Sequence, residues 1–208
     1  MDFVAIDFET ATSARTSACS LGICEVKNNT VISRRDMLIR PVPFEFNEYN
    51  VKIHGITPDM VWDAPTLAEL WPDVRHSLEN RLVIAHNASF DINVLCKTLE
   101  YFGIDYPSFD YLCTVKLSQK AYPALESHKL NALGHALGIN FSHHDACDDA
   151  YACAMVLLNI IHDYKLNSLD ELIEHFNIGI GHIYPGFIEP CTKHKKKPPK
   201  KAAAVQLK

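Results

Sequence analysis

The chain has 208 residues, a hydrophobic fraction of 48% and a formal net charge of −5 at pH 7. This size suits one globular domain with its own core, and no apolar run approaches the roughly 18 residues of a transmembrane helix. We therefore expect a cytoplasmic protein with no membrane association. Seven cysteines without a Cys-x-x-Cys pair indicate reduced thiols instead of a disulfide framework.

The charge is unevenly distributed along the sequence. All 25 acidic residues lie at or before Glu189, whereas seven of the 20 lysines and arginines follow it. An acidic body of this kind does not bind a long polyanion by charge alone. The Lys-rich end, residues 193–208, is expected to be disordered. It is either a nucleic-acid-binding arm or, as is commoner for such a run, a solvated terminus.

The first predicted strand carries the first candidate site. Phe3–Thr10 is a short apolar run, typical of a buried central strand, and it contains Asp7 and Glu9. Because side chains alternate along a strand, the two acids project from one face, roughly 7 Å apart. If they are buried they need a positive partner, for which a divalent metal is the obvious candidate; at an exposed strand end they need none.

After this strand the pattern predicts an antiparallel hairpin and then a helix. The strands Ala18–Glu25 and Thr30–Ile39 flank Asn28 and Asn29, which suit the left-handed backbone of a tight turn. Apolar residues at helical spacing predict a helix over Thr66–Asn80.

A second buried strand, Leu82–Ala85, precedes a helix that ends near Gly103. At 100° per residue, Asp91 falls within the apolar stripe of this helix, where a carboxylate needs a partner. The plainer alternative is that Asp91 only stabilises the helix dipole, by a few tenths to ~1 kcal/mol. The next predicted elements are a strand and two helices: Phe109–Val115, Leu117–Ala121 and Ser127–Leu137, with Ser127 as N-cap.

The longest predicted helix reaches about Tyr164, with Asp145 as its N-cap. Its apolar stripe places Asp149 on the core side and Asp148 nearly opposite. His144, five residues before Asp149, can meet it only from the loop that precedes the helix. A last helix is predicted over Ser168–Phe176, and the Gly- and Pro-interrupted stretch Asn177–Cys191 is expected to be irregular.

Three motifs together resemble the DEDDh exonucleases, the family typified by DnaQ, the epsilon proofreading subunit of bacterial DNA polymerase III. They are Asp7-Phe8-Glu9-Thr10, His86-Asn87-Ala88-Ser89-Phe90-Asp91 and His144-Asp145-Ala146-Cys147-Asp148-Asp149-Ala150, and the segment His54-Gly55-Ile56-Thr57 also matches. The resemblance implies a ribonuclease-H-like α/β fold, a mixed five-stranded sheet flanked by helices. It implies an exonuclease domain over residues 1–165, followed by a helix and irregular extension over 166–192 and a basic tail over 193–208.

The resemblance also implies hydrolysis of DNA from the 3′ end to nucleoside 5′-monophosphates, in proofreading or repair, with two divalent cations, Mg²⁺ or Mn²⁺. Asp7 would bridge both ions, Glu9 and Asp149 would hold the ion that binds the attacking water, and Asp91 would act directly or through a water. His144 would be the general base. The chemistry of the residues agrees, because carboxylate oxygens suit such ions and a neutral imidazole accepts a proton near pH 7.

Six residues are expected to contact the substrate, because they flank the acids or match family segments: Phe8, Thr10, His54, Ile56, Asn87 and Phe90. Core packing is the alternative for the two phenylalanines. The expected partners are single-stranded or frayed 3′ ends of DNA and, through the C-terminal extension, a polymerase. Alternatives are the same chemistry on RNA or oligonucleotides, and an inactive module that binds nucleic acid or a polymerase. The presence of all four acids and the histidine argues against an inactive module.

Overall fold

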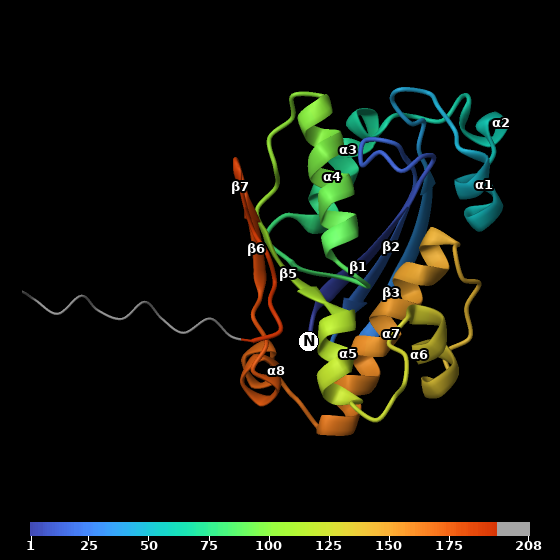
Figure 1. The fold of residues 1–208 in the computed structure, drawn as a ribbon. Coiled ribbons are helices and arrows are strands. Elements are labelled where there is room, and N and C mark those ends of the chain that lie inside the picture. Colours follow the sequence, from blue (N-terminus) through green and yellow to red (C-terminus); the bar gives the residue numbers. More distant parts are fainter. Residues whose placement is uncertain (195–208) are drawn as a thin grey trace, which may run out of the picture.

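A seven-stranded sheet of order β3-β2-β1-β4-β5-β6-β7 runs through the computed structural model, which describes residues 1–194 (Figure 1). The strands are β1 (Phe3–Thr10), β2 (Ala18–Lys27), β3 (Thr30–Leu38), β4 (Leu82–Ala85), β5 (Phe109–Cys113), β6 (Gly181–Tyr184) and β7 (Phe187–Glu189). Strands β1, β4 and β5 are parallel, and the strands on both sides of them pair antiparallel. The predicted mixed sheet is confirmed, but it has seven strands instead of five.

Helices cover both faces of this sheet (Figure 1). They are α1 (Glu48–His54), α2 (Pro58–Val61), α3 (Leu67–Leu78), α4 (Ser89–Tyr101), α5 (Thr114–Ala121), α6 (Leu130–Leu137), α7 (Ala146–Tyr164) and α8 (Leu169–Phe176). One buried cluster joins the sheet to α5, α6, α7 and α8, and a second joins it to α3 and α4. None of the helices in the described part of the chain has the length and apolar character needed to cross a membrane.

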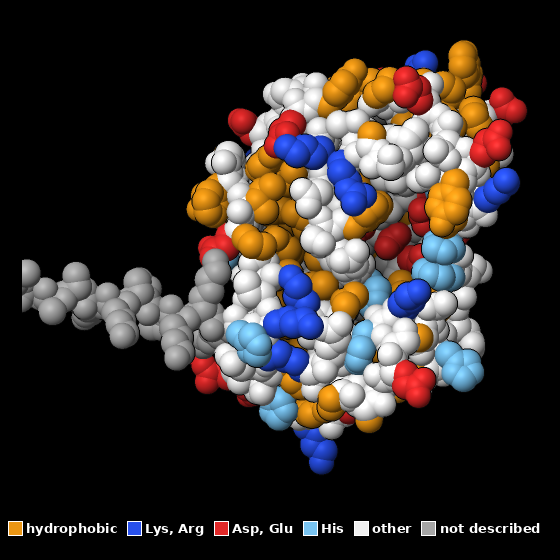
Figure 2. All heavy atoms as spheres, viewed as in Figure 1, with side chains coloured by type: hydrophobic (Ala, Val, Ile, Leu, Met, Phe, Trp, Pro, Cys, Tyr) orange, Lys and Arg blue, Asp and Glu red, His pale blue; other side chains and the backbone are white. Residues whose placement is uncertain are grey.

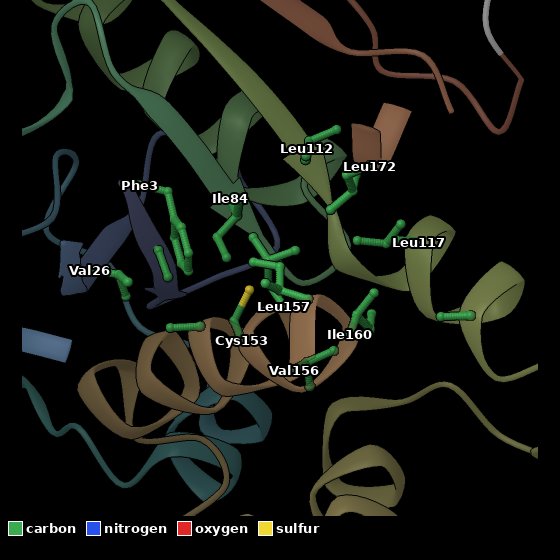
Figure 3. Packing of buried hydrophobic residues seen from close by; sticks show 14 of the residues in the cluster. Phe3, Val26, Ile84, Leu112, Leu117, Cys153, Val156, Leu157, Ile160 and Leu172 are labelled. Atoms are coloured by element: carbon green, nitrogen blue, oxygen red, sulfur yellow. The ribbon is translucent and has the colours of Figure 1, made fainter. Parts of the chain in front are cut away.

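Strand β1 lies between the two buried clusters, and its side chains alternate between them. Phe3 and Ala5 belong to the cluster on the α7 side, where Figure 3 shows Phe3 near Cys153 and Leu157 of that helix. The intervening residues of β1 belong to the cluster with α3 and α4. Asp7 therefore continues the row that faces α7, which directs this acid, and Glu9 after it, toward the helix that carries the third motif.

The stretch Asn177–Cys191, expected to be irregular, contains the two additional strands. Strand β6 pairs antiparallel with β5, and β7 pairs with β6. A Cβ on Gly181 would lie 2.3 Å from the ring of Tyr111, so the residue that looked like a strand breaker permits the close approach of β6 to β5. Lys116 Nζ donates to the Cys191 carbonyl at 2.5 Å and Lys120 Nζ to the Phe176 carbonyl at 2.6 Å, which ties this segment to α5.

Local turn chemistry was predicted correctly at one position and wrongly at another. Asn28 and Asn29 have φ of 50° and 58°, as the tight hairpin requires. Helix α6, however, begins at Leu130 with Lys129 as its N-cap, and not at Ser127. The carbonyl of His128 contacts Nε2 of His86 at 3.0 Å, and this long-range contact holds the residues before α6 out of the helix. Most of the predicted disordered tail, residues 195–208, lies outside the described residues.

Candidate active site

Acids from three elements converge at one end of the central strands. The carboxylate oxygens of Asp7, Glu9 and Asp149 lie within 4.8 Å of one another. Asp149 is on the buried side of α7, and Asp91, in the first turn of α4, is fully buried. The prediction that Asp149 faces the core and Asp148 does not is confirmed, since Asp149 is buried and Asp148 points outward to an ion pair with Arg34.

The close approach of α7 to the sheet depends on a glycine that the sequence reasoning did not single out. A Cβ on Gly22 of β2 would lie 1.9 Å from the carbonyl oxygen of Ala146 and 2.5 Å from the amide nitrogen of Cys147. The first turn of α7 therefore rests directly on the β2 backbone. This contact brings Asp149 within reach of the two acids of β1.

Asp91 is fixed by one hydrogen bond and left with one free oxygen. The backbone N–H of Phe8 donates to Asp91 Oδ1 at 3.0 Å. Oδ2 is buried and has no hydrogen-bond partner among the described residues. Leaving a buried carboxylate oxygen unpaired is costly, so a further ligand is expected there.

Burial raises the pKa of all four acids, and at Asp7 and Glu9 the neighbouring carboxylates raise it further. Burial, followed by the charges of Asp149 and Asp91, raises the pKa of Glu9 to about 8. Burial also raises the pKa of Asp91 to about 8 and lifts the pKa of Asp149 above its usual range. Asp7, buried and surrounded by the other three, has a pKa well above its ordinary value. Without a cation the cluster therefore holds protons near neutral pH.

These residues fit divalent cations. The donors are hard carboxylate oxygens, one of them unpartnered, and the mutual repulsion that raises their pKa values is the repulsion a cation would relieve.

The loop before α7 presents two histidines to this cluster. Asp145 is the N-cap of α7, accepting from the Asp148 N–H at 2.9 Å, and His144 precedes it with a left-handed backbone, φ 70°. The His144 N–H donates to Asp149 Oδ2 at 2.9 Å, and its ring Nδ1 lies 3.9 Å from Glu9 Oε1. Burial, and next the neighbouring histidine, lower the pKa of His144. The predicted position of His144 in the loop is confirmed.

The second histidine, His143, directly precedes the third motif and was not among the predicted site residues. Its Nδ1 lies 3.0 Å from Asp149 Oδ1, and its ring stacks on that of His144 with 3.9 Å between centroids. His143, His144 and Asp149 form a second group of three potential ligands within 4.8 Å of one another. His143 therefore belongs to the site as a partner of Asp149.

A cavity of about 620 Å³ opens over the acids, and Figure 2 shows acidic side chains recessed in a hollow of this face. Five of the six predicted substrate contacts line it: Phe8, Thr10, His54, Asn87 and Phe90. Ile56 does not, because its side chain packs against Ala11, Cys19 and Val61 behind the wall. Ile53, one residue before His54 on α1, lines the cavity instead.

Several further lining residues were not predicted: Asn50, His86, Gln119, His128 and Lys129. Of these, His86 could have been predicted from the sequence, because it lies within the second motif. Its Nδ1 lies 2.9 Å from Thr114 Oγ1, and burial lowers its pKa to about 4, so it is neutral at physiological pH. His54 contacts the Thr10 carbonyl through Nε2 at 3.2 Å, which fixes its ring at the cavity wall.

Comparison with known proteins identifies the family. Residues 4–157 match the exonuclease family RNase_T. The chain belongs to this exonuclease family, and the four acids and the histidine of its three motifs are the DEDDh set. DEDDh exonucleases are hydrolases, so this chain is a nuclease by family.

Curated relatives of this DEDDh exonuclease are much longer proteins. It is 31% identical over 164 residues to DNA polymerase III PolC-type of Clostridium perfringens, covering 75% of this chain and 11% of the relative. It is 30% identical over 192 residues to DNA polymerase III PolC-type of Bacillus subtilis, covering 88% and 13%. The chain thus corresponds to about an eighth of these polymerases.

Solved structures share the fold of this DEDDh exonuclease. Exonuclease X in complex with 5′ overhanging duplex DNA superposes with a TM-score of 0.66 at 24% identity, covering 79% of this chain and 94% of that one. The nuclease domain of 3′hExo bound to rAMP superposes with a TM-score of 0.67 at 16% identity, covering 78% and 92%. The predicted ribonuclease-H-like fold is confirmed.

Proposed function

We propose that this protein is a 3′→5′ exonuclease that hydrolyses DNA to nucleoside 5′-monophosphates with two divalent cations. The observation that carries the proposal is the convergence of Asp7, Glu9 and Asp149 with His144 beneath one cavity, with Asp91 buried behind them on the Phe8 N–H. No packing requirement explains buried acids that repel one another this strongly.

Asp7, Glu9, Asp91 and Asp149 would hold the cations. When bound, two such ions neutralise charge on the attacking and leaving oxygens of a phosphodiester. Carboxylate donors favour Mg²⁺ or Mn²⁺ over softer metals. Other residues of the chain would supply the general base and orient the nucleotide.

His144 is the general base of this proposal. A base must be neutral to accept a proton, and the burial that lowers the pKa of His144 keeps it neutral at physiological pH. Its backbone N–H and the ring of His143 hold Asp149 in one orientation. His143 is therefore a positioning residue, and His144 removes the proton from the attacking water.

The terminal nucleotide would occupy the cavity. Thr10, His54 and Asn87 present polar groups there, and Ile53 and Phe90 supply apolar wall. Phe8 is 2% exposed, so its backbone, more than its ring, serves the site. These three polar residues would orient the sugar and the base of the nucleotide.

DNA is the substrate we favour, because the curated relatives are DNA polymerases with which the chain shares its nuclease region. The alternative is RNA or an oligonucleotide, and one structural neighbour is a 3′-exonuclease that recognises a histone mRNA stem-loop. By the same relationship, a polymerase is a proposed partner, through the segment after α7. An inactive binding module is the least favoured alternative, since the four acids and His144 all reach the site.

The test uses 5′-labelled single-stranded DNA, frayed duplex DNA and RNA of one sequence, incubated with Mg²⁺, Mn²⁺ or EDTA. We expect a ladder of progressively shorter labelled DNA that requires metal, which is the pattern of 3′→5′ digestion. Asp7→Ala should abolish it while the fold remains, and Asp148→Asn, a nearby acid outside the cluster, should retain it. Immediate release of labelled mononucleotide, or cleavage by Asp7→Ala, would contradict the proposal.

A further inference from the structure

The guanidinium of Arg15 lies at the edge of the cavity. Among the described residues, no carboxylate forms an ion pair with it. Its guanidinium carbon lies 4.2 Å from the ring centroid of Phe90, which lines the cavity. Within residues 1–194, ion pairs with carboxylates are instead formed by Arg34, Arg35, Arg75 and Arg81. Arg15 is therefore an exposed charge held on an aromatic face beside the active site.

The backbone of Arg15 is held in place by the turn that follows β1. The Ala11 N–H donates to the Ser17 carbonyl at 2.8 Å, and the Thr12 N–H donates to Ser17 Oγ at 3.1 Å, so the turn closes on itself. Thr98 Oγ1 of α4 donates to the Val94 carbonyl at 2.8 Å and lies 3.4 Å from the Arg15 carbonyl. The closed turn thus lies against the helix that carries Phe90, which limits where the guanidinium can lie.

An arginine in this arrangement suits a phosphate. Stacking occupies one face of the planar guanidinium and leaves its N–H edge free for a bidentate contact with phosphate oxygens. The surrounding site is acidic, and a polyanionic strand approaching four carboxylates is repelled unless cations lie along its path.

We propose that Arg15, stacked on Phe90, binds a backbone phosphate of the substrate strand on the 5′ side of the scissile bond. The proposal rests on the 3′→5′ polarity proposed above. An enzyme that removes one nucleotide from a 3′-hydroxyl end has no phosphate on the 3′ side of the scissile one. A second phosphate contact must therefore belong to the next nucleotide on the 5′ side.

Substrate length tests this assignment. Thymidylyl-thymidine has only the scissile phosphate, whereas a thymidine decamer offers the next one. Arg15→Ala should lower kcat/KM for the decamer by roughly 10- to 100-fold, the effect of losing one charged hydrogen-bonded contact. It should leave kcat/KM for the dinucleoside unchanged. The salt dependence of decamer binding should flatten by a slope of about 0.7, as expected for one phosphate on a single strand.

Two variants refine the test. Phe90→Leu keeps the wall apolar but removes the stacking surface. Because Phe90 also lines the cavity, some loss on the dinucleoside is expected, but the loss on the decamer should be larger, and the difference between the two should be smaller than in Arg15→Ala. Arg40→Ala is the matched control. Arg40 also stacks on aromatic rings, 5.5 Å from the Phe44 centroid, but Phe44 does not line the cavity. It should cleave both substrates like the unaltered protein.

Equal losses on the dinucleoside and the decamer would overturn the proposal, because Arg15 would then act at the scissile phosphate or on the fold. Unchanged decamer cleavage by Arg15→Ala, or an equal loss in Arg40→Ala, would overturn it as well. If the unaltered protein released no nucleotide from any 3′ end, the proposed function itself would fail. Fluorescence anisotropy of a labelled decamer with Ca²⁺ would still decide on Arg15, since equal Kd values for both proteins would refute the contact.

Discussion

Replacing Glu9 by glutamine is expected to abolish the nuclease and to stabilise the metal-free protein at alkaline pH. The folded-state pKa of Glu9, raised by burial and by Asp149 and Asp91, is about 8, against an ordinary value of 4.5. A carboxyl whose pKa is raised on folding keeps its proton in the folded state while the unfolded chain loses it. The unfolding free energy therefore falls as pH rises from about 4.5 to 8. A glutamine has no such proton to lose.

The size of the effect follows from the pKa. A rise from 4.5 to about 8 at about 1.4 kcal/mol for each pKa unit gives a ceiling of about 5 kcal/mol at pH 8. The glutamine amide must itself be hydrogen-bonded in a buried place, which offsets about 1–3 kcal/mol. We therefore expect Glu9→Gln to be more stable than the unaltered protein by about 2–4 kcal/mol at pH 8. At pH 4, where the carboxyl is largely protonated in both states, only the cost of burying the amide remains, and the variant should be less stable than the unaltered protein by about 1–3 kcal/mol.

Urea unfolding in EDTA between pH 4 and pH 8.5 measures this difference directly. Mg²⁺ or Mn²⁺ should then stabilise the unaltered protein at pH 8 more than Glu9→Gln, since the variant lacks one ligand. Glu45→Gln, at an exposed glutamate outside the cluster, is the control. Parallel stability curves for the unaltered protein and Glu9→Gln across this pH range would refute the reasoning.

His144→Ala should lower the single-turnover rate by roughly 10²–10⁴. For the unaltered protein this rate should rise with pH and reach its plateau early, because the pKa of His144 is lowered; the same pH profile in the variant would contradict a base role. His143→Ala should cost roughly 10-fold or less, because a lost hydrogen bond to Asp149 disturbs orientation only; a loss as large as that of His144→Ala would exchange their roles. Gly22→Ala should lower the unfolding free energy by roughly 1–3 kcal/mol and reduce activity, because its Cβ would meet the Ala146 carbonyl. Urea unfolding and single-turnover assays check this, and a fully active, equally stable variant would refute the close contact.

The positions of the metal acids followed from local periodicity. Counting 100° per residue placed Asp91 and Asp149 on buried faces and Asp148 outside, and the structure agrees because a helix fixes those directions without help from distant residues. His144 could be placed in the loop for the same reason. The left-handed backbone of His144 was not predictable, and it places two consecutive, stacked rings at the acid cluster, His143 against Asp149 and His144 near Glu9.

Features that depend on contacts between distant segments were missed. Gly22 has no local signature, because its importance lies in the Ala146 carbonyl that approaches it from a helix more than a hundred residues away. Gly181 was misread for a related reason, since a glycine that interrupts a local pattern can also admit a neighbouring ring. The family segment around His54 located a wall of the cavity, but the end of α1 decides that Ile53 faces inward and Ile56 does not.

The segment after α7 limits where the chain can be truncated. The family match ends at residue 157, inside α7, and a chain truncated at residue 165 would keep the four acids and His144. Such a chain would lack β6, leaving the backbone of β5 as an unpaired edge and uncovering Tyr111. Exposed edges of this kind recruit other chains, so the shortened protein should self-associate. Catalytic residues and C-terminal strands are thus expected to unfold in one cooperative transition.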